Sequence, residues 1–84
     1  MGISVVEPQA LALSARCSDD DLVVVLSDGR TISTPIAWFP TLAAATVAQR
    51  ANLEILGQGE GLHWPELDED IGIAGLLRDI RRQA

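Results

Sequence analysis

The sequence predicts a small α+β protein that folds as a single domain over residues 1–84. Two hairpin regions, around Asp28-Gly29 and around the glycine-rich stretch 57–61, predict an antiparallel sheet. Short segments between them predict middle helices, and an apolar stripe predicts a C-terminal amphipathic helix. Its members, at i, i+3, i+4 and i+7, are Ile73, Leu76, Leu77 and Ile80. The composition, 48% hydrophobic and 21% charged, is globular.

The N-terminal third predicts strands. Residues 1–9 are short and interrupted by Pro8, so they predict an edge strand or a loose arm. Residues 10–17 alternate weakly and predict a strand with a half-buried face. That face would carry Leu11, Leu13, Ala15 and Cys17.

The segment 22–34 predicts a hairpin with a type I′ turn, because Asp28-Gly29 tolerates the positive φ that this turn requires. The turn would place Val25 opposite Ile32 and on one face with Val23. Both faces of the strand 22–26 are apolar. The sequence therefore predicts that the core covers one face and that a neighbouring chain, as in a homodimer, covers the other.

Short helices are predicted next. Thr34-Pro35 indicates a helix start with Thr34 as its cap. Pro40 forces Phe39 out of the helical region and opens a second helix to residue 45. Thr46 and Gln49 fit a capping box for a third helix that ends near residue 52. The apolar residues expected to press this segment onto the sheet are Trp38, Phe39 and Leu42.

The second hairpin comprises strands 53–56 and 62–64 around the turn 57–61, and Pro65 ends it. Residues 66–70 are predicted to form a polar turn. Gly72 is expected to cap the last helix, with Ile71 and Leu76 as a hydrophobic staple. The acidic residues before this helix and the arginines at its end both complement the helix dipole.

Charge and cysteine content exclude several classes of protein. The net charge is −6, and all six cations are arginines. Only Arg78, Arg81 and Arg82 cluster, whereas a nucleic-acid binder carries a basic patch. One cysteine excludes an internal disulfide and suits a reducing compartment. With no signal-peptide pattern and no membrane-length apolar run, we expect a cytoplasmic protein without membrane contact.

The stretch 57–70 combines glycines, the single histidine and carboxylates, and it invites a metal or catalytic interpretation. His63 with Asp68 and Asp70 could form the centre of a metal-dependent enzyme. The spacing does not match an EF-hand, and no second histidine supports zinc. A Cys17–His63 pair and a Glu66–Asp70 carboxylate pair are the other catalytic possibilities. A structural role is favoured, so no enzyme activity, catalytic residue, metal or cofactor is expected.

Several motifs together resemble a bacterial family of domains of unknown function, number twenty-four forty-two. They are Leu26-Ser27-Asp28-Gly29-Arg30, Trp38-Phe39-Pro40, Gln49-Arg50-x-Asn52, Gly57-x-Gly59-x-Gly61-x-His63-Trp64-Pro65 and Leu67-Asp68-Glu69-Asp70-Ile71. The resemblance covers residues 10–78. It implies a small α+β domain without established catalytic residues. It also implies a gene beside that of another small protein, similar to a toxin–antitoxin pair, with this chain in the antitoxin place.

We therefore expect a protein–protein interaction domain, antitoxin-like, that neutralises a basic, toxin-like partner encoded nearby. The alternatives are a dimeric DNA-associated regulator acting through the three C-terminal arginines, and the metal-dependent enzyme. Binding of nucleic acid without a protein partner is not expected. The residues expected to contact the partner are Trp38, Phe39, His63, Trp64, Glu66, Asp68, Glu69 and Asp70.

Overall fold

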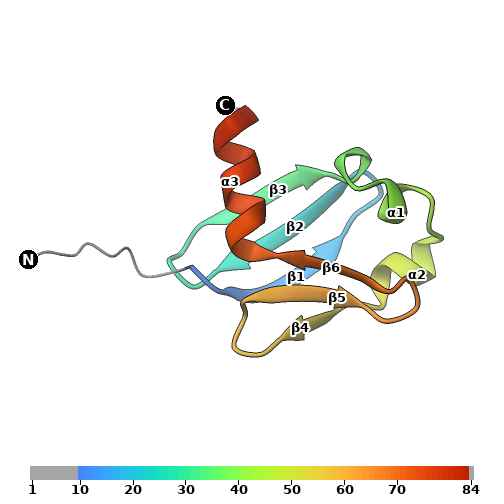
Figure 1. The fold of residues 1–84 in the computed structure, drawn as a ribbon, viewed down its shortest axis with the longest axis horizontal. Helices are drawn as coiled ribbons and strands as arrows, with labels where there is room; N and C mark the ends of the chain where they lie inside the picture. The colour runs from blue at the N-terminus through green and yellow to red at the C-terminus, as the bar shows by residue number, and fades with distance from the viewer. Residues whose placement is uncertain (1–9, 84) are drawn as a thin grey trace, which may run out of the picture.

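Two three-stranded antiparallel sheets face each other across the core of the computed structural model, which describes residues 10–83 (Figure 1). The segment 1–9, for which an edge strand or loose arm is predicted, lies outside the described residues. The first sheet, in the order β1-β2-β3, consists of β1 (Ala12–Cys17), β2 (Asp21–Leu26) and β3 (Thr31–Pro35). The second, in the order β4-β5-β6, consists of β4 (Glu54–Leu56), β5 (Gly61–Trp64) and β6 (Glu69–Gly72).

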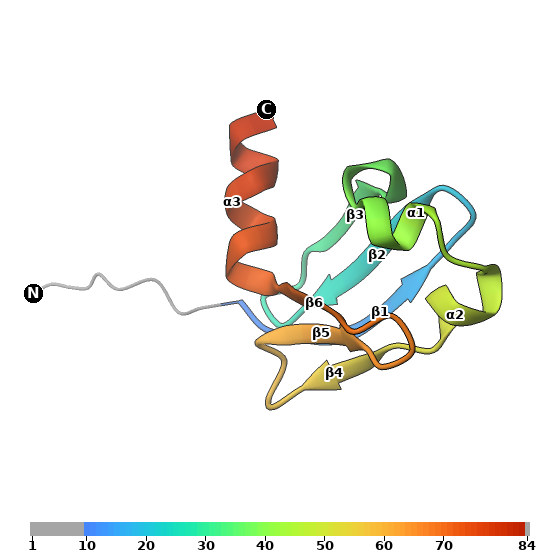
Figure 2. The same cartoon turned by 45° about the vertical axis from the view of Figure 1, so that its right-hand side comes forward.

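Short helices connect the sheets and one longer helix follows them. They are the 3-10 helix η1 (Ile36–Trp38), α1 (Pro40–Ala43), α2 (Val47–Ala51) and α3 (Ile73–Gln83). Figures 1 and 2 show α1 and α2 at one end of the fold and α3 at the other. The α+β class, the short middle helices and the C-terminal helix are confirmed. None of the helices in the described part of the chain is long and apolar enough to cross a membrane.

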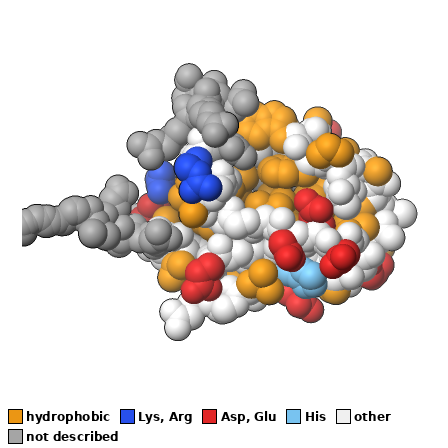
Figure 3. All heavy atoms as spheres, viewed as in Figure 1, with side chains coloured by type: hydrophobic (Ala, Val, Ile, Leu, Met, Phe, Trp, Pro, Cys, Tyr) orange, Lys and Arg blue, Asp and Glu red, His pale blue; other side chains and the backbone are white. Residues whose placement is uncertain are grey.

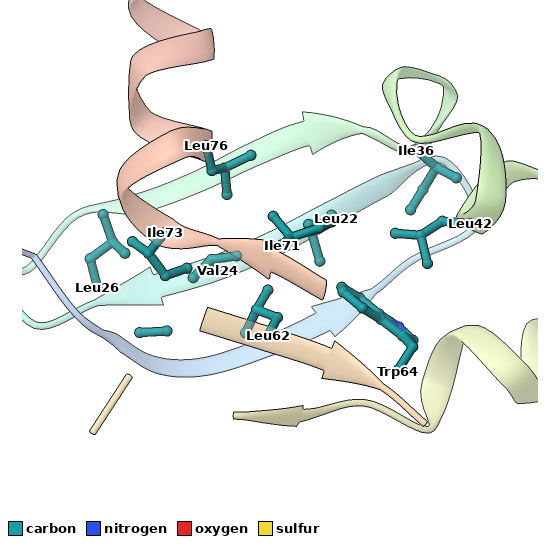
Figure 4. Close-up of a cluster of buried hydrophobic side chains, with 11 residues drawn as sticks. Leu22, Val24, Leu26, Ile36, Leu42, Leu62, Trp64, Ile71, Ile73 and Leu76 are labelled. Atoms are coloured by element: carbon teal, nitrogen blue, oxygen red, sulfur yellow. The ribbon is translucent and has the colours of Figure 1, made fainter. Parts of the chain in front are cut away.

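The core lies between the inner faces of the two sheets and the first turns of α3 (Figure 4). Alternate residues of β2 (Leu22, Val24 and Leu26) are completely buried, as are Leu62 and Trp64 of β5. Burying one such side chain contributes about 1.5–3 kcal/mol. The core is completed by Ala12, Ile36, Leu42, Ile71, Ile73 and Leu76.

The face predicted for the first strand is wrong at its beginning. Ala12 is buried and Leu13 is 64% exposed, although the alternation placed Leu13 inward. The cause is a register shift between Ala12 and Ser14, where β1 carries an irregularity against β2. An extra residue in one strand reverses the faces that follow it. Beyond it, Ala15 and Cys17 pack against the core as predicted.

The β2–β3 hairpin exists, but its predicted turn type and register are wrong. Only Gly29 has a positive φ in this turn, at 96°, so the type I′ conformation is excluded. The Leu26 N–H donates to the Arg30 carbonyl (2.8 Å), which leaves three residues in the loop. Ile32 consequently pairs with Val24 on the core side. Val25 pairs with Thr31 instead.

The predicted helix cap Thr34 is instead a strand residue. It is completely buried in β3, opposite Leu22, and η1 begins after Pro35 without a side-chain cap. Among the described residues, the Thr34 hydroxyl is the buried side-chain group without a hydrogen-bond partner. An unpaired buried hydroxyl costs about 1–3 kcal/mol.

We expect Thr34→Val to raise the free energy of unfolding by about 1 kcal/mol, since valine keeps the branched shape and removes the unpaired hydroxyl. Urea denaturation measures the change. Thr31→Val, at an exposed position of the same strand, is the matched control and should shift stability by less than about 0.5 kcal/mol. A destabilised Thr34→Val protein would mean that the hydroxyl has a stabilising partner.

Other local predictions for the middle segment are confirmed. Phe39 is extended (φ −121°, ψ 91°) before Pro40. The Thr46 hydroxyl accepts from the Gln49 N–H, and the Gln49 side chain accepts from the Thr46 N–H, which completes the capping box of α2. These signals depend on residues only one to three positions apart, so tertiary packing does not alter them.

The acidic segment before α3 differs from its prediction. Glu69 and Asp70 belong to β6, a strand where a polar turn was expected, and Gly72 ends that strand. The first turn of α3 contains no acidic residue. The Ile73 N–H donates to the Glu60 carbonyl (2.9 Å), which ties the helix start to the β4–β5 turn.

Candidate functional site

An acidic face lies on the outer side of the second sheet, with His63 at its centre. In the strand register His63 of β5 is opposite Glu54 of β4 and Asp70 of β6. Side chains alternate along a strand, so the burial of Leu62 and Trp64 turns His63 outward. Figure 3 shows the histidine surrounded by acidic side chains. We call Glu54, His63, Asp68 and Asp70 the acidic face.

The imidazole of His63 is held by Asp70, whose Oδ1 accepts a hydrogen bond from Nδ1. Asp70 itself is 68% exposed. This hydrogen bond is the largest cause of the raised pKa of His63, followed by an opposing effect of partial desolvation. The negative charges of Asp70, Glu54 and Asp68 raise the pKa further. The histidine thus becomes charged more readily than in a free peptide.

The His63–Asp70 contact should make stability depend on pH near neutrality. Because the folded-state pKa is raised, the contribution is fully present below the unfolded pKa of about 6.5 and is lost as pH rises through the folded value. Denaturation midpoints of the wild type should fall over this range. His63→Gln should remove that part of the pH dependence. An unchanged pH profile in His63→Gln would contradict the contact.

The other predicted acidic residues, Asp68, Glu66 and Glu69, have three different environments. Asp68 adopts a positive φ of 52° in the turn before β6. Glu66 accepts a hydrogen bond from the Asn52 side chain (3.0 Å). Glu69 is half-buried opposite Trp64, on the inner side of the sheet. The structure therefore joins His63, Asp68 and Asp70, and places Glu69 apart.

Sequence reasoning missed Glu54. The predicted turn 57–61 was one residue too long, and in the structure Leu56 pairs with Gly61. The four-residue loop 57–60 brings Glu54 opposite His63. Gly57 and Gly59, with φ of 58° and 115°, are the signal for this tighter loop.

The predicted aromatic contacts separate into buried and exposed groups. Trp64 is completely buried, and its Nε1–H donates to the Arg50 carbonyl (3.0 Å). It packs the core and presents no surface to a partner. Trp38 is 40% exposed and Phe39 packs partly against the core, both in the segment before α1.

The catalytic pairs considered from sequence are not assembled. Cys17 packs against the core, where burial raises the pKa of its thiol. His63 points to the opposite side of the sheet, so the two do not pair. Glu66 and Asp70 bond to different partners. Across the described residues, no three His, Cys, Asp or Glu side chains are grouped to hold a metal ion.

The arginines invoked for DNA contact lie on the last helix. Arg78 is exposed on α3. The side chains of Arg81 and Arg82 lie beyond those that the structure describes. The arrangement of the three arginines as a group therefore lies outside the described residues.

Comparisons with known proteins agree with the fold. A family model described as "Protein of unknown function (DUF2442)" matches residues 12–82. A crystal structure of a protein of unknown function from Rhodospirillum rubrum ATCC 11170 is similar to this chain, with a TM-score of 0.78 and 35% sequence identity. The similarity covers 86% of this chain and 89% of that one. No curated protein matches.

Proposed function

The chain belongs to the DUF2442 family of proteins of unknown function, and we propose that it acts in the cytoplasm as a protein–protein interaction domain, antitoxin-like, that binds and neutralises a basic partner encoded nearby. The observation that carries this proposal is the acidic face, where Glu54, Asp68 and Asp70 gather around His63. The net charge of −6 adds a long-range attraction for a basic surface.

The acidic face suits fast, salt-sensitive association. Glu54 on β4 and Asp70 on β6 flank His63 on the central strand β5, and Asp68 lies in the turn before β6, so the sheet sets their backbone positions before a partner arrives. Complementary charge steers the encounter and raises the association rate, while neighbouring apolar contacts set the lifetime of the complex. Exposed large apolar side chains on the adjacent edge strand β4, Ile55 and Leu56, can supply such contacts.

Co-expression with the product of the neighbouring gene tests the proposal. We expect the two proteins to co-purify at about physiological salt and to separate as salt is raised, because salt screens exposed charges. The double variant Glu54→Gln/Asp70→Asn should weaken recovery. Asp19→Asn/Asp20→Asn is the matched control, since it makes the same charge change at exposed positions in the β1–β2 turn.

Two results would defeat the proposal. One is a failure of the wild-type proteins to co-purify at any salt concentration. The other is an equal loss of recovery in both double variants, because only overall charge, and not the acidic face, would then matter.

We also propose a homodimer through the outer face of β2. Val23 and Val25 lie there half-buried, between exposed polar residues of β1 and β3. Light scattering should give twice the chain mass for the wild type and the mass of one chain for Val23→Asp/Val25→Asp. A monomeric wild type would exclude the dimer.

A further inference from the structure

β4 is an edge strand with one side of its backbone left open. Among residues 10–83 it forms ladder hydrogen bonds with β5 alone. All three of its residues are exposed, including Ile55 at 37% and Leu56 at 39%. Figures 1 and 2 both show β4 at the outer margin of the second sheet. A row of unpaired N–H and C=O groups is a template for one more strand.

β4 is short and carries Glu54, but three other protections of an edge strand are absent from it. Proteins blunt such edges with lysine, proline or a bulge. β4 contains Glu54, Ile55 and Leu56, and its register with β5 is regular over all three pairs. Two of its three side chains are large and apolar.

The charge beside this edge favours a basic occupant. Glu54, His63 and Asp70 form a row across the outer face of the sheet, and a strand added beside β4 would extend that row by one residue. A basic side chain is favoured there, next to Glu54. On the inner side the added strand would place a residue beside Ile55, which favours an apolar side chain.

We propose that the β4 edge accepts an extended strand of the basic partner, in which basic and apolar residues alternate. This inference rests on the proposed function and specifies how the partner binds. Backbone hydrogen bonds to β4 supply affinity, and the alternating side chains supply specificity. Self-pairing of β4 between two copies is disfavoured because it places two acidic faces side by side.

The surface next to β4 also suits an added strand. β1 contacts β4 and exposes Leu13. Backbone pairing joins the same region, since the Ala12 N–H donates to the carbonyl of Gly59 in the β4–β5 turn (2.8 Å). The edge is thus held in place by the first sheet and does not need to order before binding.

A peptide titration tests the edge independently of the partner. The probe is a short synthetic peptide of alternating arginine and valine, added to the full chain while backbone amide chemical shifts are recorded. We expect the largest shifts at residues 54–56 and little change with a control peptide of alternating glutamate and valine. Shifts confined to other strands, or no shifts at millimolar peptide, would overturn the proposal.

Substitutions in the chain test strand addition at β4 with the co-expressed partner. Leu56→Lys adds the charge that protects natural edges, and we expect about tenfold weaker binding. Val47→Lys is the matched control, because Val47 is 66% exposed on α2, and it should bind as the wild type does. Amide spectra establish that both variants are folded.

The outcomes separate the two proposals. The strand addition is supported if the partner slows hydrogen exchange at the β4 amides and binds Leu56→Lys more weakly than Val47→Lys. If it binds but Leu56→Lys has no effect and β4 exchanges as before, the strand addition fails and the proposed function stands. If the partner never binds, the proposed function fails. The chemical shifts in the peptide titration then decide whether the β4 edge accepts an added strand.

Discussion

Trp64→Ala is expected to lower the free energy of unfolding by about 3–5 kcal/mol and leave much of the chain unfolded. Trp64 is completely buried between the sheets, and its indole N–H donates to the Arg50 carbonyl. Truncation removes the largest side chain of the core and leaves that carbonyl without this donor. Far-ultraviolet circular dichroism during urea titration measures the loss.

The second tryptophan is the matched control for this prediction. Trp38 is 40% exposed and lies outside the hydrophobic core. Trp38→Ala should cost less than about 1 kcal/mol. Equal losses in the two variants would contradict the placement of Trp64 as the central core residue.

Gly59→Ala is expected to destabilise the fold by about 3 kcal/mol or more, from steric overlap together with backbone strain. Gly59 has a φ of 115°, and a Cβ there would lie 2.6 Å from the Ala12 carbonyl oxygen and 2.8 Å from the Ala12 nitrogen. These are backbone atoms, so a side-chain movement cannot relieve the overlap. The turn would have to separate from β1, at the junction of the two sheets.

Two other glycines separate the causes of that loss. Gly29 also has a positive φ (96°), but a Cβ there meets nothing within 4 Å, so Gly29→Ala should cost only the strain of about 1 kcal/mol. Gly72→Ala has neither problem and should change stability by less than about 0.5 kcal/mol. Thermal denaturation of the three variants compares them. A similar loss at Gly59 and Gly29 would exclude the steric overlap.

Local sequence signals predicted much of this fold. The capping box of α2, the extended Phe39 before Pro40 and the apolar stripe at the start of α3 all involve residues a few positions apart. The strand β2 was predicted to be apolar on both faces with the core on one of them, and Leu22, Val24 and Leu26 form that core face. Such signals act within one element, so the surrounding fold leaves them unchanged.

Register between strands was not predictable in the same way. The irregularity after Ala12 and the three-residue loop at Gly29 each displace a pairing by one residue, which reverses faces. β6 was missed because its acidic residues are unusual in strands, and pairing with β5 overrides that weak preference.

The candidate site shows the same contrast between local sequence signals and strand register. His63, Asp68 and Asp70 are close in sequence and could be grouped by inspection. Glu54 joins them only through the register of β4 with β5. Trp64 was expected to contact a partner together with His63, but adjacent strand residues point to opposite sides of a sheet, and Trp64 faces the core.

The most direct test of the acidic face as a binding surface is the salt dependence of affinity. Calorimetric titration of the purified chain with the protein encoded by the neighbouring gene gives the Kd over a series of salt concentrations. We expect the wild-type Kd to rise steeply with salt, and the slope to become shallower in Glu54→Gln/Asp70→Asn. A wild-type Kd that does not change with salt, or an equal slope in the variant, would contradict the proposed role of the acidic face.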